Sequence, residues 1–486
     1  MLPVVILALP LVAAGAAVRP WRPWVGWVGA SSVACVLVLG VVLAARVVSG
    51  APLIALGGLL RVDALSAFMV IVIGSVALLA TWQSVRYLTH EIGAGRCTRR
   101  HASLYAVLVQ AFVATMLLAV LASNVGVLWV AVEATTVTTT FLVGHRGTAK
   151  ALEASWKYIV ICSVGIAMAF LGTVLVYLAS EHAGGSTPGD LDWTSLMRAA
   201  RHLNPGVMRL ALGLLLLGYG TKVGLAPMHS WLPDAHSQAP APVSALMSGV
   251  LLSVAFYALL RFEAIANRTL GVGFPRLLLV IGGLLSLLVA ASLLLTQRDY
   301  KRMLAYHSIE HMGLVALGAA AASPLAIAAV LLHVLGHGLA KAVLFLVSGE
   351  ILLVESTSEI AQVRALLTRR PALGGLFAAG LIALLGLPPF SLFISEFNML
   401  RAEVQTGLVG PASVALVAMA VIFAAVMAHG RHLLLGGASG SATLPSPTPR
   451  MVTLPLVGGL LTCAVLGVSA WPLQTLLVAA AHVVAR

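Results

Sequence analysis

Long apolar stretches separated by short polar segments make up most of this chain. Because a helix needs about 20 apolar residues to cross the hydrocarbon of a bilayer, each stretch predicts a transmembrane helix. We count fourteen such stretches, at residues 2–18, 24–48, 64–83, 104–122, 125–144, 155–179, 207–228, 242–262, 274–295, 303–322, 325–349, 372–399, 409–430 and 452–470. The last segment, 471–486, is too short for a fifteenth span, and we expect it to lie along the membrane interface. The pattern predicts an all-α polytopic membrane protein.

Two of these stretches are interrupted by proline beside glycine. The first reads Gly224-Leu-Ala-Pro-Met228 and the second reads Gly386-Leu-Pro-Pro-Phe390. Proline lacks a backbone donor and clashes with the preceding turn, so we expect helix breaks at Pro227 and at Pro388 and Pro389. The motifs lie 162 residues apart (386 minus 224), which corresponds to five spans. An odd number of spans inverts the second copy, and paired broken helices in an inverted repeat indicate a transport site.

The repeat divides the chain into four parts. Residues 1–103 hold the first three helices, and residues 104–262 form the first five-helix repeat. Residues 263–435 form the second repeat, and residues 436–486 hold the fourteenth helix and the tail. The broken helices are then the seventh and the twelfth.

Three single charged residues stand out against this apolar background. Glu133 lies near the middle of its stretch, Lys222 precedes the first break and Glu396 follows the second. A charge at the centre of a membrane costs about 2.5–3.5 kcal/mol on insertion scales, so these residues are candidates for proton transfer. We expect Lys222 to face the interior and to approach Glu133 directly or through water. The alternatives are a snorkelling Lys222, a neutral structural Glu133 and a Glu396 that faces water at a helix end.

His333, His337 and Lys341 follow one another at four-residue spacing, which places them on one helix face. Histidine suits proton transfer because its ordinary pKa is about 6.5. The alternatives are core histidines bonded to backbone carbonyls, or a metal pair. A metal is disfavoured because Lys341 carries a positive charge and no third ligand is evident in the sequence. We therefore expect no metal site.

A further polar set consists of His229, Lys301, Glu310 and His311. The segment from His307 to His311 matches the His-x-x-Glu-His pattern of a class of zinc proteases. It lies in an apolar span with no sign of a cleft for a peptide, so we interpret Glu310 and His311 as interior polar residues, with His307 nearer the Lys301 end. No phosphate loop, dinucleotide fingerprint, haem or iron–sulfur pattern occurs, and we expect no cofactor.

Composition supports the membrane class. The chain of 486 residues is 60% hydrophobic and 9% charged, with a mean hydropathy of +1.03, whereas soluble proteins carry about 25% charged residues. The net charge of +13 comes from basic residues scattered between apolar runs, so it predicts no nucleic-acid partner. The four cysteines, Cys35, Cys97, Cys162 and Cys463, show no pairing or metal spacing and are expected to be inert.

Loop charges predict the orientation. Alternate loops on one side carry sixteen of the 29 Lys and Arg residues, the other side carries ten, and three lysines lie at or within spans. The richer side is the cytoplasm, which places both termini outside the plasma membrane. The chain has 24 Arg but only five Lys, and Lys222 and Lys341 lie deep in apolar stretches. This use of lysine favours proton chemistry, because lysine can lose its proton and arginine effectively cannot.

Several of these motifs resemble the antiporter-like membrane subunits of respiratory complex I, group 4 membrane-bound hydrogenases and multi-subunit Na⁺/H⁺ antiporters. The resemblance covers roughly residues 104–430 and is closest to component F of hydrogenase-4-type complexes. The stretches that carry it are Gly224–His236, Pro242–Leu246, Asp299–Tyr306, Ser308–Gly313, His333–Lys341 and Leu385–Phe397.

This resemblance implies fourteen helices, two inverted five-helix repeats and a polar axis that joins two half-channels. It implies functional roles at Glu133 of the fifth helix, Lys222 of the first broken helix, Lys301 after the ninth helix, His333, His337 and Lys341 of the eleventh helix, and Glu396 of the second broken helix. Many relatives have a histidine at the position of Ser248. The link between the two halves is then expected to use water or another residue.

Three functions remain open at this stage. The first is a proton-translocating subunit of a hydrogenase-type or NADH:quinone oxidoreductase-type complex, which has other membrane subunits as partners and carries no redox chemistry itself. The second is a Na⁺/H⁺ antiporter subunit without a redox partner. The third is a structural subunit, which the cost of unpaired buried charges disfavours.

Overall fold

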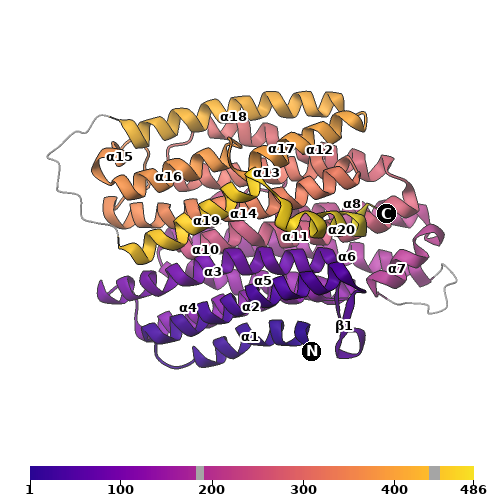
Figure 1. Ribbon diagram of the computed structural model, residues 1–486, viewed down its shortest axis with the longest axis horizontal. Coiled ribbons are helices and arrows are strands. Elements are labelled where there is room, and N and C mark those ends of the chain that lie inside the picture. Colours follow the sequence, from indigo (N-terminus) through magenta and orange to yellow (C-terminus); the bar gives the residue numbers. More distant parts are fainter. Residues whose placement is uncertain (182–190, 437–448, 486) are drawn as a thin grey trace.

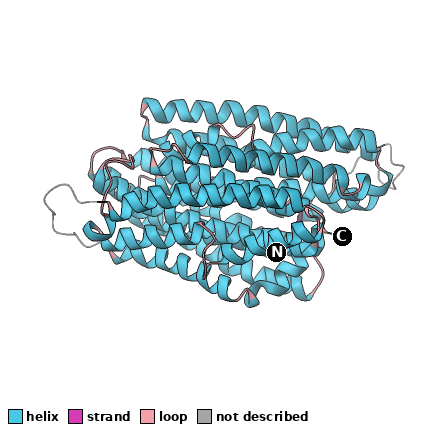
Figure 2. Cartoon of the chain, turned by 90° about the horizontal axis from the view of Figure 1, so that it is seen from above, coloured by secondary structure: helices cyan, strands magenta, loops and turns pink. Residues whose placement is uncertain are grey.

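The computed structural model describes residues 1–181, 191–436 and 449–485. Its long helices lie side by side along one direction, with α1 (Leu2–Ala16) at one edge and α18 (Val409–Leu435) at the other (Figure 1). A view turned by 90° shows the same helices in nearly parallel rows (Figure 2). The other helices are α2 (Pro23–Ser49), α3 (Ala64–Gly93), α4 (Arg99–Leu121), α5 (Val125–Val143), α6 (Ala149–Glu181), α7 (Trp193–Ala199), α8 (Pro205–Val223), α9 (Trp231–Gln238), α10 (Ala241–Leu246), α11 (Leu252–Leu270), α12 (Gly273–Leu294), α13 (Tyr300–Ala320), α14 (Pro324–Glu355), α15 (Leu366–Arg369), α16 (Pro371–Leu384), α17 (Ser391–Gln405), α19 (Arg450–Val468) and α20 (Trp471–Val484).

Eleven helices of the described residues are long and apolar enough to cross a membrane, and three apolar helices are shorter. Helices occupy all fourteen predicted stretches, and the predicted all-α membrane class is confirmed. Several helices, such as α3 and α14, extend beyond their predicted ends. Hydropathy counts only the apolar part of a helix, so it misses polar turns that continue toward water. A short hairpin of β1 (Leu53–Ala55) and β2 (Leu60–Val62) joins α2 to α3.

Both proline-glycine motifs coincide with the ends of helices. The α8 helix ends before Gly224 and α9 begins seven residues later, while α16 ends before the Gly386 motif and α17 begins after it. Gly224 and Gly386 have φ angles of +84° and +61°, which favour glycine. A side chain at Gly224 would also collide with Leu232, and one at Gly386 would collide with Glu396. Each break thus brings a residue of the following helix against its glycine.

The α14 helix and the α10–α11 segment form the buried centre of the molecule. A π-helical turn, Met247–Leu251, joins α10 to α11, and such turns often occur at functional sites. Gly249 of this turn contacts Gly338 of α14 so closely that a Cβ on Gly249 would lie 2.9 Å from the Gly338 carbonyl oxygen. Small residues allow membrane helices to approach in this way.

The beginning of α1 and the end of α20 lie at the same end of the helix rows (Figure 1). This arrangement agrees with two termini on one side of the membrane, and the side itself stays a prediction. The α20 helix packs against α3 and α14 and buries Leu476 and Leu477. Residues 437–448 and 486 of the predicted C-terminal part lie outside the described residues.

Candidate functional site

Lys222 lies in the last turn of α8 and is completely buried. Its Nζ donates a hydrogen bond of 2.8 Å to the Tyr158 hydroxyl of α6 and lies 5.0 Å from the centroid of that ring. Among the described residues, no ion pair joins Lys222 to Glu133, so the direct form of the predicted approach is not made, and an approach through water stays a prediction. The buried ammonium group instead has an uncharged partner that sequence reasoning missed.

Tyr158 connects Lys222 to the helix that carries Glu133. The Tyr158 hydroxyl lies 2.6 Å from Thr139 Oγ1 of α5. One turn earlier on the same helix, Thr136 Oγ1 donates a 2.8 Å hydrogen bond to the half-buried Glu133. The threonines between 135 and 140 form a polar run inside an apolar stretch. This run is the feature of the sequence from which a polar connection to Glu133 could have been predicted.

Ser248 of the π-helical turn contacts α13. Its hydroxyl lies 2.8 Å from Ser308 Oγ of α13, next to His307 in the sequence. His236 of α9 is also buried, with Nδ1 2.8 Å from the Leu232 carbonyl oxygen and its ring beside that of Phe345 of α14. His236 ends the Gly224–His236 motif and was not among the residues predicted to transfer protons. Its Nε2 has no hydrogen-bond partner among the described residues.

Lys301 and His229 were predicted as members of one further polar set, but they lie in different surroundings. Lys301 is buried at the start of α13, and its Nζ donates to the carbonyl oxygens of Ser237 at 2.7 Å and Ala239 at 3.0 Å. It therefore satisfies carbonyl groups at the end of α9, where a positive charge is favourable. His229 lies in the break between α8 and α9, where it is partly exposed. No described contact joins it to Lys222.

Four buried histidines of α13 and α14 meet in one cluster. His311 packs against His307, His333 and His337, with ring centroids 5.0 Å away in each case. His311 Nδ1 lies 3.0 Å from His333 Nε2, and His333 Nδ1 lies 3.0 Å from Ser395 Oγ of α17. His307, on α13 like His311, lies between Lys301 and His311 in the sequence, and its ring stacks on that of His311.

Two carboxylates and a lysine complete this histidine cluster. Glu310 Oε2 lies 2.6 Å from His307 Nδ1, although the two groups are not aligned for a hydrogen bond. Glu396 Oε1 lies 3.9 Å from His311 Nδ1. Glu396 is buried, which excludes the alternative that it faces water. The buried Lys341 donates to the carbonyl oxygen of Leu304.

The cluster corrects one sequence-based statement about metals. His311, His333 and Glu396 place one ligand atom each within 4.8 Å of one another, so a third donor is present after all. It was missed because Glu396 comes from a helix more than 60 residues further along the chain. Lys341 lies on the same helix face as His333, and its positive charge still opposes a bound cation.

Imidazole rings in contact can pass a proton, because each ring has one nitrogen that accepts while the other donates. His337 offers two ring nitrogens without partners among the described residues. The cluster is therefore chemically suited to proton transfer within the protein interior.

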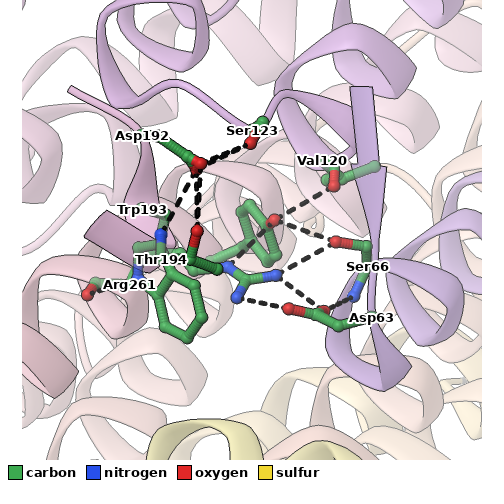
Figure 3. Close-up of polar contacts among 9 residues, drawn as sticks. Asp63, Ser66, Val120, Ser123, Asp192, Trp193, Thr194 and Arg261 are labelled. Carbon is green, nitrogen blue, oxygen red and sulfur yellow. Dashed lines mark hydrogen bonds and ion pairs between the residues drawn. The ribbon is translucent and has the colours of Figure 1, made fainter. Parts of the chain in front are cut away.

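A separate buried ion pair lies near the hairpin (Figure 3). Arg261 of α11 donates two hydrogen bonds of 2.7 Å to Asp63 and one of 3.0 Å to Ser66. Its guanidinium also lies 4.4 Å from the ring centroid of Trp193. Arg261 is one of the ten basic residues that the loop-charge count places on the extracytoplasmic side, and its inclusion as a loop residue is wrong because only 5% of its surface is exposed. Asp63 caps α3, so the pair fixes α3 to α11.

Gly386→Ala should impair the cluster by displacing Glu396. The new methyl group would occupy the space of the Glu396 carboxylate, and the φ of +61° would add strain. We expect proton flux in membrane vesicles to fall at least severalfold. Gly375→Ala is the matched control, because a Cβ there meets no atom within 4 Å. Equal flux in both variants would contradict the role of this contact.

Comparison with known proteins places the chain among membrane subunits. Residues 122–427 match the family described as "NADH:quinone oxidoreductase/Mrp antiporter, TM". The chain is 38% identical over 346 residues to the Hydrogenase-4 component F homolog of Methylacidiphilum infernorum, covering 71% of this chain and 73% of that protein. It is 30% identical over 383 residues to Hydrogenase-4 component B of Escherichia coli, covering 74% of this chain and 54% of that protein.

Solved structures share the fold. A chain of the archaeal membrane-bound sulfane sulfur reductase matches with a TM-score of 0.88 at 23% identity, covering 100% of this chain and 98% of that chain. A chain of the Mrp complex from Dietzia sp. matches with a TM-score of 0.83 at 20% identity, covering 99% and 97%. A chain of respiratory complex I from Thermus thermophilus gives 0.83 at 22% identity, covering 100% and 99%.

Proposed function

Because the chain belongs to the NADH:quinone oxidoreductase/Mrp antiporter family of membrane subunits, we propose that it translocates protons as one subunit of a redox-driven membrane complex. Its relatives include proteins named as hydrogenase-4 components and as NADH-quinone oxidoreductase subunit N. The redox chemistry is assigned to partner subunits. The chain lies in the plasma membrane with both termini on the extracytoplasmic side, as the loop charges predict.

The observation that carries this proposal is the chain of contacts among His311, His333 and Ser395 inside the protein. A row of imidazole and hydroxyl groups in hydrogen-bond distance can move a proton without moving the backbone. Two of the buried lysines, Lys222 and Lys341, also have uncharged hydrogen-bond partners. Lysine can exist in protonated and neutral forms when it is desolvated, so each of them can store a proton and release it.

The proposed path has two halves, which correspond to residues 104–262 and 263–435. In the first half, Glu133 and Lys222 exchange charge through the threonines of α5 and Tyr158. In the second half, Lys341 leads to the histidine cluster and Glu396. We assign the connection between the halves to His236 and to the Ser248–Ser308 contact. Together they would take the role of the histidine that many relatives have at the position of Ser248.

Charge alternation would drive this path. In a medium of low dielectric constant, a charge strongly affects the protonation of its neighbour. A partner subunit that changes the charge state of Glu133 at one end would change the occupancy of Lys222. The effect would then pass to Lys341 and the histidine cluster, so that a proton leaves at the far end.

Na⁺/H⁺ exchange is the second candidate, because the fold is similar to that of a chain of the Mrp complex. The polar groups of the histidine cluster favour protons over Na⁺. They are mainly imidazole rings and the ammonium group of Lys341, whereas hard cations prefer several oxygen ligands. The two functions differ in what drives them, and that difference can be measured.

His311→Gln should lower proton translocation by about 10²-fold, the typical loss when a positioned acid–base group is removed. The measurement is acidification of inside-out vesicles from cells that assemble the complex, started by its electron donor. His202→Gln is the control, since His202 is exposed outside the long spans. Acidification driven by a Na⁺ gradient without electron donor would favour the antiporter. Unchanged flux in His311→Gln would refute the proposed path.

A further inference from the structure

Three potential metal ligands meet where α4 begins and α5 ends. Cys97 precedes α4, His101 lies in the first turn of α4, and His145 lies in the 3₁₀ turn Gly144–Arg146 that follows α5. The cysteine sulfur and one nitrogen of each ring lie within 4.8 Å of one another. The two histidine rings have centroids 4.2 Å apart. This group is separate from the residues proposed for proton transfer.

Two of these ligands are buried and His101 is exposed, and all three border a cavity. Cys97 and His145 are 9% and 7% exposed. Tyr105 packs against the His145 ring in a T-shaped arrangement, with centroids 5.0 Å apart. A cavity of about 540 Å³ borders all three ligands and extends to Tyr87 of α3 and Leu352 of α14. A small molecule such as water can reach the ligands from this cavity.

The charges around the cavity are partly balanced. Arg96 pairs with Glu91 through contacts of 2.8 Å and 3.2 Å, so its positive charge already has a partner. Arg146 also lines the cavity. A metal-bound thiolate at Cys97 would contribute a negative charge that offsets the incoming cation.

We propose that Cys97, His101 and His145 bind one Zn²⁺ ion, with a water molecule from the cavity as the fourth ligand. One thiolate and two imidazoles form a ligand set that suits zinc, and three protein ligands with an open position are characteristic of accessible zinc sites. Binding releases the thiol proton of Cys97 to solvent, because the thiolate is the ligand. The ion ties the loop between α3 and α4 to the end of α5.

Cobalt is the spectroscopic probe for this site. The full-length protein is purified in detergent, treated with a chelator and titrated with Co²⁺ near neutral pH. We expect one equivalent to bind, with a thiolate-to-cobalt charge-transfer absorption and the intense visible bands of a tetrahedral ion, and Zn²⁺ should displace it. Cys97→Ser should abolish the charge-transfer absorption. Cys35→Ser is the control and should keep it, because Cys35 is an exposed cysteine of α2.

A second measurement separates loss of the site from loss of folding. In the Cys35→Ser background, Zn²⁺ should slow the alkylation of Cys97 by a maleimide, since Cys162 and Cys463 are fully buried. His145→Gln should raise the Zn²⁺ concentration needed for this protection. The increase should exceed the roughly 10–100-fold loss of metal affinity that removal of an outer-shell partner causes. A charge-transfer band that persists in Cys97→Ser, or alkylation that Zn²⁺ does not affect, would overturn the proposal.

Discussion

Lys222→Met should abolish proton translocation while the complex still assembles. Methionine has a similar length and fills the same buried space, but it cannot carry a proton. The hydrogen bond from Lys222 to Tyr158 would be lost, and the first half of the path would end at the tyrosine. The measurement is the initial rate of acidification in inside-out vesicles, normalised to the amount of assembled complex. We expect a rate at the level of the uncoupled background.

Lys157→Met is the matched control, because Lys157 lies on α6 with nearly half of its side chain exposed. Glu133→Gln combined with Lys222→Met tests whether the two residues act together. The double variant should lose little more than either single variant. Tyr158→Phe keeps the ring and removes only the hydroxyl that connects them. A wild-type rate in Lys222→Met, or independent losses that multiply in the double variant, would show that Lys222 is not part of such a path.

Arg261→Met should cost about 3–5 kcal/mol of stability, which is typical when one partner of a buried ion pair is removed. The substitution leaves the Asp63 carboxylate buried without its two hydrogen bonds from the guanidinium. It also removes the contact with the Trp193 ring. The measurement is the midpoint of thermal unfolding in detergent, together with the yield of monodisperse protein.

Arg209→Met provides the control for this experiment, since Arg209 is exposed on α8. Asp63→Asn combined with Arg261→Met should recover part of the loss, because it removes the uncompensated charge. Burial alone would raise the pKa of Asp63, but Arg261 overrides it and holds the pKa below its ordinary value. The contribution of the pair is therefore complete above about pH 3.9 and is lost only as the pH falls further. Equal midpoints for the two arginine variants would contradict the anchoring role.

Much of the architecture follows from the sequence because its causes are local. Twenty apolar residues in a row specify a spanning helix, and proline beside glycine specifies where it ends. Buried ionisable residues such as Lys222 and Lys341 stand out because almost nothing else in their stretches is charged. These signals require no knowledge of which helices are neighbours.

The features that the sequence did not predict all depend on contacts between helices or loops that lie apart in the sequence. Tyr158 looks like an ordinary core aromatic until α6 places it against Lys222. Arg261 lies near the end of an apolar stretch, where an arginine normally faces a loop, and only the position of Asp63 explains its burial. Cys97 and His145 lie 48 residues apart, so no spacing rule connects them.

The contact between Gly249 and Gly338 limits how the protein can move. Their backbones touch, so the π-helical turn and α14 cannot approach further, and separating them would open a gap in a tightly packed centre. Ser248 directly precedes Gly249, and His337 directly precedes Gly338. The same contact therefore sets the distance between the backbones of Ser248 and His337. A turnover cycle that leaves this crossing intact would therefore move protons past it by side-chain rotation and transient hydration, without backbone rearrangement at Gly249 and Gly338.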